Sequence, residues 1–264
     1  MGKFTTLSKQ MSRYFIHMAY DGTAYCGWQI QPNEKTVQQV MEHALSTILR
    51  QEISVTGAGR TDTGVHASHF VAHFDVEDAD QKSLAFDPSS EEFVFKLNRF
   101  LPPDIVVYKI TPVSSDKHAR FSATYRSYHY HISSIKPLYT RKYSLHIYGR
   151  LDLAAIEECC SIILKTTDFT SFAKLHSDVQ TNNCNVMFAQ WKEEEQGYLF
   201  EIRADRFLRN MVRSLTGTLL DVGQGKISVQ EFQDIVDAKD RSKAGQSAPA
   251  RGLFLVDIGY EDLA

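Results

Sequence analysis

Apolar positions in the first 115 residues recur with two periods, and their order predicts a β-α-β-β-α-β unit. Runs typical of strands occupy residues 14–20, 53–58, 69–76 and 105–110. Apolar residues at helical spacing follow directly after Thr36 and continue to Leu49, and Thr36 with Gln39 three residues later predicts a capping box at the start of this helix. A second helix is predicted from Glu91 to Arg99, because the Pro102–Pro103 pair disfavours helix beyond it.

The remaining residues repeat this order and add one helix, although the sequence itself is not repeated. Strands are predicted at residues 121–134, 186–191, 198–204 and 253–258. Asp152 is expected to cap one helix, and Asp205 a second helix that continues to about Val222. Ser228, with Glu231 three residues later, forms a capping box that predicts the additional helix.

These elements predict the fold class α/β (α+β), with two ferredoxin-like units in tandem. Residues 1–12 are polar and predict a flexible N-terminal tail. Residues 13–115 are expected to form the first α/β unit and residues 116–264 the second. The chain of 264 residues is long enough to bury a substantial core without disulfides or metal.

Composition narrows the class of protein further. Hydrophobic residues make up 43% of the chain and aromatic residues 11%, which excludes an intrinsically disordered chain. No apolar run approaches the roughly 18 residues that a membrane span needs, and the N-terminus lacks the apolar core of a signal peptide. The four cysteines show no C-x-x-C spacing, so we expect reduced thiols and a cytoplasmic protein.

The net charge of −3 neither favours nor excludes nucleic acid as a partner, but the distribution of charge is informative. Residues 117–150 contain seven Lys and Arg, no Asp or Glu, and six of the twelve tyrosines. Cations interleaved with aromatic rings suit a phosphate backbone and unstacked bases. A solvated basic face explains the same run, and composition does not separate the two interpretations.

The segment GAGRTDTGVHA, at residues 57–67, lies between two predicted strands and is the most unusual in the chain. Its three glycines permit a tight backbone path. Asp62 occupies the third glycine position of the dinucleotide-binding pattern and no helix follows, so that pattern is excluded. One carboxylate, Asp62, and one guanidinium, Arg60, remain. From these residues alone, a hairpin turn with a surface ion pair is the simpler interpretation.

Residues 59–67, GRTDTGVHA, resemble the active-site loop of the tRNA pseudouridine synthase A family. Further segments similar to motifs of that family are YDGT at 20–23, GWQ at 27–29, HARFSAT at 118–124, YHY at 128–130, FLRNMVR at 207–213, AKDR at 238–241 and PARGL at 249–253. The motifs follow one another through both halves of the chain. The resemblance implies a pseudouridine synthase fold with a mostly antiparallel sheet, in agreement with the tandem units.

The same resemblance implies an isomerase that converts uridine to pseudouridine at positions 38–40 of the tRNA anticodon stem-loop. It also implies a homodimer that binds tRNA. The reaction breaks the N-glycosidic bond, turns the base and rejoins it through C5, without redox change or energy input, so no cofactor is expected. One nucleophilic carboxylate can serve, by attack on the sugar C1′ or on the base, and the sequence does not choose between them.

The resemblance assigns roles to five side chains. Asp62 corresponds to the catalytic aspartate of the family. Tyr128 corresponds to the active-site tyrosine, which could stack on the uracil, although core packing is the commoner role of a strand tyrosine. Arg213 corresponds to the arginine that pairs with the aspartate and keeps it ionised. Arg60 resembles the residue that replaces the flipped-out base, and Leu253 is expected to line the base pocket.

The basic residues around Arg213 have an alternative interpretation. On a helix that begins after Asp205, the side chains of Arg206, Arg209 and Arg213 share one side. Such a side is also typical of the solvated face of an amphipathic helix. For Arg206 and Arg209 both interpretations stay open, including contact with phosphates only.

Two other classes of function fit the sequence less well. A non-catalytic RNA-binding protein of two RRM-like units shares the element order, but residues 69–76 lack the start of the RNP1 pattern. A nucleotide-binding metabolic enzyme lacks any phosphate-loop motif. His66, His69 and His73 are close in sequence, but no acidic residue or cysteine completes a ligand set, so no metal is expected.

Overall fold

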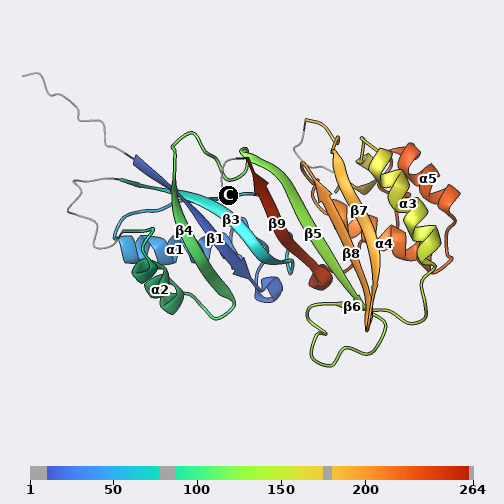
Figure 1. Ribbon diagram of the computed structural model, residues 1–264, viewed down its shortest axis with the longest axis horizontal. Helices are drawn as coiled ribbons and strands as arrows, with labels where there is room; N and C mark the ends of the chain where they lie inside the picture. The colour runs from blue at the N-terminus through green and yellow to red at the C-terminus, as the bar shows by residue number, and fades with distance from the viewer. Residues whose placement is uncertain (1–10, 78–86, 175–179, 262–264) are drawn as a thin grey trace, which may run out of the picture.

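A computed structural model describes residues 11–77, 87–174 and 180–261. Within these residues the chain forms one nine-stranded sheet, in which seven strands follow the order β4-β1-β3-β9-β5-β8-β7 (Figure 1). Two short strands lie off this path, with β2 paired to β3 and β6 paired to β5. Strand pairs are antiparallel except β3 with β9 and β5 with β6. The predicted mixed α/β fold with a mostly antiparallel sheet is therefore confirmed.

The first half of the described chain has the predicted β-α-β-β-α-β order. Its elements are β1 (Met11–Tyr20), the 3-10 turn η1 (Gly22–Ala24), α1 (Val37–Leu49), β2 (Val55–Gly57), β3 (His66–Glu77), α2 (Glu91–Phe100) and β4 (Ile105–Val113). Strand β1 includes Met11 and Ser12, which belong to the predicted tail, and residues 1–10 lie outside the described residues.

The second half has the same order with the predicted additional helix. Its elements are β5 (Ala123–Ser133), β6 (Leu145–His146), α3 (Leu153–Lys165), η2 (Thr170–Phe172), β7 (Val186–Glu194), β8 (Gly197–Ala204), α4 (Met211–Gly223), α5 (Val229–Ala238), η3 (Ala250–Gly252) and β9 (Leu253–Tyr260). Strand β6 and the 3-10 turns are additions that the sequence pattern does not predict.

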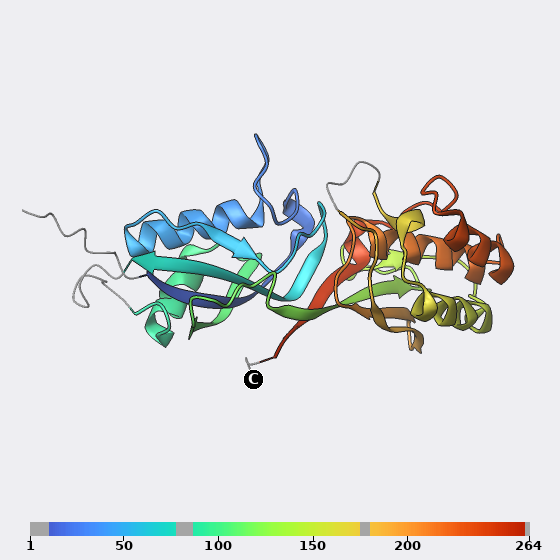
Figure 2. The same ribbon diagram turned by 90° about the horizontal axis from the view of Figure 1, so that it is seen from above.

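The last strand, β9, joins the two halves. It pairs in parallel with β3 of the first half and antiparallel with β5 of the second half. The helices gather at the two ends of the sheet, while β9 and β5 run between these groups (Figures 1 and 2). The buried apolar residues form one cluster that includes side chains from both halves. Loops from both halves therefore meet over a continuous sheet rather than across a linker.

Helix starts follow local side-chain chemistry in three predicted cases. The Thr36 hydroxyl accepts a hydrogen bond from the Gln39 backbone N–H, and the Asp152 carboxylate accepts one from the Ala155 N–H. Ser228 forms the reciprocal capping box with the helix residue three positions later. All three N-caps are confirmed, but the capping box predicted at Thr36 is not: among the described residues only the bond from the Gln39 N–H to the Thr36 hydroxyl is present.

The prediction that Asp205 caps a helix is wrong. Its carboxylate instead accepts hydrogen bonds from the backbone N–H groups of Arg206 and Asn185. Helix α4 begins six residues later, at Met211, after Asn210 in the left-handed conformation. Phe207, in the loop before α4, stands at the helical spacing of the apolar residues that follow. It is apolar because its ring packs against Tyr128, not because the loop is helical.

Candidate active site

Residues 22–28 form backbone hydrogen bonds with the loop that carries Asp62. The Gly64 N–H donates to the Tyr25 carbonyl over 3.2 Å, and the Trp28 N–H donates to the Thr61 carbonyl over 3.3 Å. Gly27 has φ +83° and a Cβ placed on it would lie 2.4 Å from the Thr61 carbonyl oxygen. Only glycine permits this approach, so the loop is seated directly on the segment after β1.

Two arginines from the second half of the chain face the Asp62 carboxylate. Arg213, in the first turn of α4, places Nη1 3.4 Å from Asp62 Oδ2, and its Nε donates to the Ala248 carbonyl over 2.8 Å. Arg209, in the loop before α4, places Nε 3.9 Å from Asp62 Oδ1. The Asp62 side chain is 25% exposed, so a ligand can reach the carboxylate between the two guanidinium groups.

An aromatic wall lies beside this ion pair. Tyr128 on β5 is buried, and its ring meets Phe207 edge to face with centroids 5.1 Å apart. Burial raises the pKa of Tyr128 above its usual range, and the negative charge of Asp62 raises it further. The Tyr20 hydroxyl lies 2.9 Å from the Thr61 hydroxyl, one residue before Asp62. A neutral phenol and a paired carboxylate thus share one environment, which suits proton handling beside a nucleophile.

The two remaining predicted site residues lie in different surroundings. Arg60 is exposed and makes no ion pair with any residue that the structure describes. Leu253 is buried at the start of β9, opposite Tyr130 in the β5 register. Because the paired residues of antiparallel strands share a face, Leu253 lies on the same face as Tyr130 and Tyr128. The structure therefore brings Leu253 to the tyrosine strand and leaves Arg60 at the surface.

The three histidines near this loop have separate partners. His66 Nδ1 lies 3.0 Å from Asp21 Oδ1, and His73 Nδ1 accepts a hydrogen bond from the Ala119 N–H. His69 points into a different hollow. Across residues 11–77, 87–174 and 180–261, no group of three or more His, Cys, Asp or Glu is arranged to hold a metal ion.

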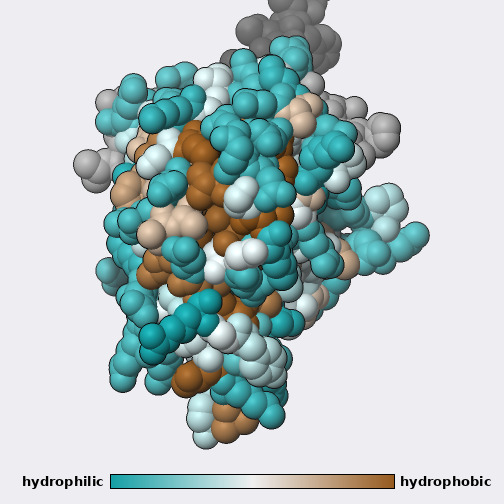
Figure 3. Space-filling model, turned by 90° about the vertical axis from the view of Figure 1, so that its right-hand side faces the viewer, coloured by the Kyte–Doolittle hydropathy of each residue, from teal (hydrophilic) through white to brown (hydrophobic). Residues whose placement is uncertain are grey.

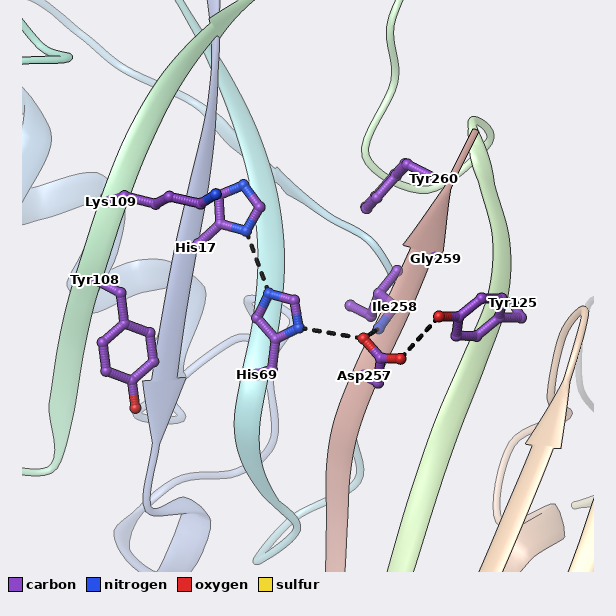
Figure 4. A pocket seen from close by; sticks show the side chains of 9 residues that line it. All are labelled: His17, His69, Tyr108, Lys109, Tyr125, Asp257, Ile258, Gly259 and Tyr260. Carbon is purple, nitrogen blue, oxygen red and sulfur yellow. Dashed lines mark hydrogen bonds and ion pairs between the residues drawn. The ribbon is translucent and has the colours of Figure 1, made fainter. Parts of the chain in front are cut away.

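The hollow beside His69 has a volume of about 470 Å³ (Figure 4). Four of its side chains form a row across β1, β3, β9 and β5 (Figure 4). In this row His17 lies 3.2 Å from His69, His69 lies 3.7 Å from Asp257, and the Tyr125 hydroxyl donates to Asp257. Asp62, Tyr128 and Arg213 do not line this hollow, so it is not the candidate active site.

A second hollow, of about 580 Å³, is basic and reaches the Asp62 loop at Gly64. Its cations are Lys136, Arg141, Lys142 and Arg251. Three of these come from the charge run at residues 117–150, and the fourth lies in η3. The structure thus places part of that run beside the loop, where a polyanion could contact both.

Comparison with known proteins identifies the family of the chain. A family model described as tRNA pseudouridine synthase matches residues 16–122 and 166–261. The chain belongs to the tRNA pseudouridine synthase family. The resemblance in the sequence motifs is thereby confirmed, and the protein is an isomerase that acts on uridine in tRNA.

Similarity to curated members of this family extends over nearly the whole chain. The tRNA pseudouridine synthase A of Bacteroides thetaiotaomicron is 50% identical over 255 residues, which cover 96% of this chain and 92% of that protein. The protein of the same name from Bacteroides fragilis is 51% identical, with coverage of 95% and 97%. That from Bacillus pumilus is 36% identical, with coverage of 93% and 98%.

Two features of the candidate active site were not predicted from the sequence. Arg209 faces Asp62 from a loop rather than from a helix face, and Phe207 packs on Tyr128 rather than on a helix core. The spacing of Arg206, Arg209 and Arg213 contained a signal for basic side chains near the site. The spacing did not show which way these side chains point, because their orientation depends on the residue at which α4 begins.

Proposed function

We propose that Asp62 is the catalytic nucleophile of uridine isomerisation in this protein and that the reaction needs no cofactor. The observation that carries the proposal is the ion pair between Asp62, on a loop of the first half, and Arg213, in the first turn of α4 in the second half, beside the buried Tyr128. The guanidinium donates from Nε to the Ala248 carbonyl, and from this fixed position its Nη1 orients the Asp62 carboxylate.

The chemistry balances without an external reagent. Attack by Asp62 at C1′ displaces uracil, which turns and forms the C1′–C5 bond as the carboxylate leaves. Attack on the base instead forms a covalent adduct between the carboxylate and the base; the N1–C1′ bond then breaks, the base turns, C5 bonds to C1′, and the carboxylate leaves the base. In both routes the C5 proton is lost and N1 gains a proton. The Tyr128 hydroxyl is the nearby group that handles a proton, and its ring stacks on the uracil.

The substitution Asp62→Asn tests the nucleophile. It keeps the shape of the side chain but removes the attacking oxygen, so we expect single-turnover pseudouridine formation to fall to background. Binding of tRNA should persist, because the amide removes a negative charge near the phosphates. Thermal melting of the same variant should show a folded protein. Turnover within tenfold of the parent would refute the assignment, and loss of folding would make Asp62 a structural residue.

We propose uridines 38–40 of the anticodon stem-loop as the target, with the hollow lined by Lys136, Arg141, Lys142 and Arg251 binding the phosphate backbone nearby. The motif resemblance supports the position, and the charge of the hollow supports the phosphate contact. Mapping of pseudouridine on unmodified tRNA after incubation with the protein tests this target. Modification confined to another region of the tRNA would contradict it.

We further propose a cytoplasmic homodimer whose chain divides near residue 115 into two α/β units. At the end of the molecule that carries α3, α4 and α5, an apolar band runs between polar side chains (Figure 3). Leu164 on α3 is 45% exposed. Such a band is a candidate dimer surface. Among the described residues no helix has the length and apolar character to cross a membrane. Sedimentation tests the dimer, and a monomer at working concentration would contradict it.

A further inference from the structure

Arg126 connects three segments of backbone near the candidate active site. It lies on β5, two residues before Tyr128, and its side chain is only partly exposed. The guanidinium donates hydrogen bonds to four backbone carbonyl oxygens, at Ala58 (2.8 Å), Arg120 (2.5 Å), Ala123 (3.1 Å) and Asp205 (2.9 Å). Burial lowers its pKa, yet the group stays a cation, since arginine keeps its proton in proteins.

Two of these carbonyls belong to the loops that build the site. Ala58 stands four residues before Asp62, at the start of the catalytic loop. Asp205 opens the loop that places Phe207 against Tyr128 and Arg209 near Asp62. One planar group therefore holds the nucleophile loop of the first half and the aromatic and cationic loop of the second half at fixed separation. A side chain with fewer or movable donors would not fix both.

We propose that Arg126 is a positioning residue for the isomerisation: it sets the Asp62 loop against the loop of Phe207 and Arg209. This inference rests on the proposed role of Asp62. The hydrogen bonds of Arg126 go to backbone carbonyls and not to the Asp62 carboxylate, so we assign its contribution to the geometry of the loops. Its charge also acts on Tyr128, since burial raises the pKa of that phenol and Arg126 lowers it to a smaller extent. A displacement near 1 Å of a reacting group can cost about 100-fold in rate, and Arg126 links both loops that define the site.

The test compares Arg126→Lys and Arg126→Ala with the parent protein. The Lys ammonium can reach one loop but not bind both carbonyls in one plane. We expect the single-turnover rate to fall by about 30-fold or more in both variants. The dissociation constant for tRNA should change by less than about threefold, because phosphate contacts are made elsewhere. Added guanidinium ion should restore part of the rate of Arg126→Ala and none of that of Arg126→Lys.

Arg203 supplies a matched control. Arg203 lies on the neighbouring strand β8, one residue before Ala204, which is the pairing partner of Arg126. The Arg203 Nε donates a hydrogen bond to the Ser127 hydroxyl over 2.8 Å. Its guanidinium also lies over the Tyr125 ring, and neither of these two interactions involves the Asp62 loop or the loop of Phe207 and Arg209. Arg203→Ala should lower the melting temperature about as much as the Arg126 variants do. Its single-turnover rate should stay within about threefold of the parent, since loss of Arg203 moves neither loop.

Several results would overturn the proposal. Single-turnover rates of the Arg126 variants within threefold of the parent would do so, as would a loss of rate matched by an equal loss of tRNA affinity. Unfolding of both variants at the assay temperature would make Arg126 a requirement of the fold rather than of the site. Asp62→Asn is assayed in parallel. If Asp62→Asn is inactive while Arg126→Lys is active, only the role of Arg126 fails. If Asp62→Asn is active, the nucleophile assignment fails.

Discussion

Gly27 is the position at which a single methyl group should disturb catalysis most directly without touching a charged side chain. Its φ of +83° costs an alanine about 1–2 kcal/mol. The new Cβ would also lie 2.4 Å from the Thr61 carbonyl oxygen and 3.2 Å from the Asp62 carbonyl carbon. Since such contacts are rarely below about 3 Å, the Asp62 loop must move by roughly 0.6 Å.

We therefore expect Gly27→Ala to lower the single-turnover rate of pseudouridine formation by roughly 10- to 100-fold, because a shift near 1 Å costs about 100-fold. The backbone strain should lower the melting temperature by about 2–8 °C. Affinity for tRNA should stay within about threefold of the parent, because the basic hollow is unchanged. The assay is single-turnover kinetics on tRNA at saturating enzyme, with melting measured on the same samples.

Substitutions at two other glycines separate the effect of loop displacement from the effect of backbone strain. Gly59 lies in the same loop with nothing within 4 Å of an added Cβ, so Gly59→Ala should keep both rate and stability. Gly225 shares the left-handed backbone, with φ +69°, but has open space around it and lies after α4. Gly225→Ala should therefore lose stability alone. A normal rate for Gly27→Ala, or an equal loss of rate in Gly225→Ala, would refute the reasoning.

Two further predictions concern charge. Substitution of Arg141 and Lys142 by Glu should weaken tRNA binding and reduce its dependence on salt concentration, while the melting temperature stays the same. Binding titrations at several salt concentrations measure both effects. Unchanged binding would mean that the basic hollow does not contact RNA. Burial, with Arg13 and His118 nearby, lowers the pKa of His73 to about 4. Because the unfolded chain takes up this proton first, the melting temperature should fall as the pH drops from about 6.5 to 4, and His73→Gln should reduce this slope. An unaltered slope would contradict the assignment to His73.

Short-range chemistry decided much of what could be predicted from the sequence. The caps at Thr36, Asp152 and Ser228 depend on hydrogen bonds within three residues, so their helices were found with correct starts. The period of apolar residues marked the strands of both halves in the correct order. The motif GRTDTGVHA, together with the later motifs, indicated the family that the comparisons confirm.

The same local reasoning failed where a long-range contact competed with it. Asp205 has the residue type of an N-cap, but its carboxylate binds the N–H of Asn185, twenty residues away, and α4 starts later. No pattern in residues 253–258 could show that β9 pairs with β3 as well as β5. Both outcomes depend on groups that approach only after the sheet has formed.

The sequence by itself determined the elements, the family motifs and the residue types that the chemistry needs. The family motifs already implied that Arg213 pairs with Asp62, 151 residues away, and the structure supplies the distance of 3.4 Å. Tertiary structure alone decided that Arg126 binds both loops around this pair. Caps and periodicity arise from interactions within one turn or one strand, so they can be read along the chain. The site arises from the register of β3, β9 and β5, and that register follows from packing of the whole sheet.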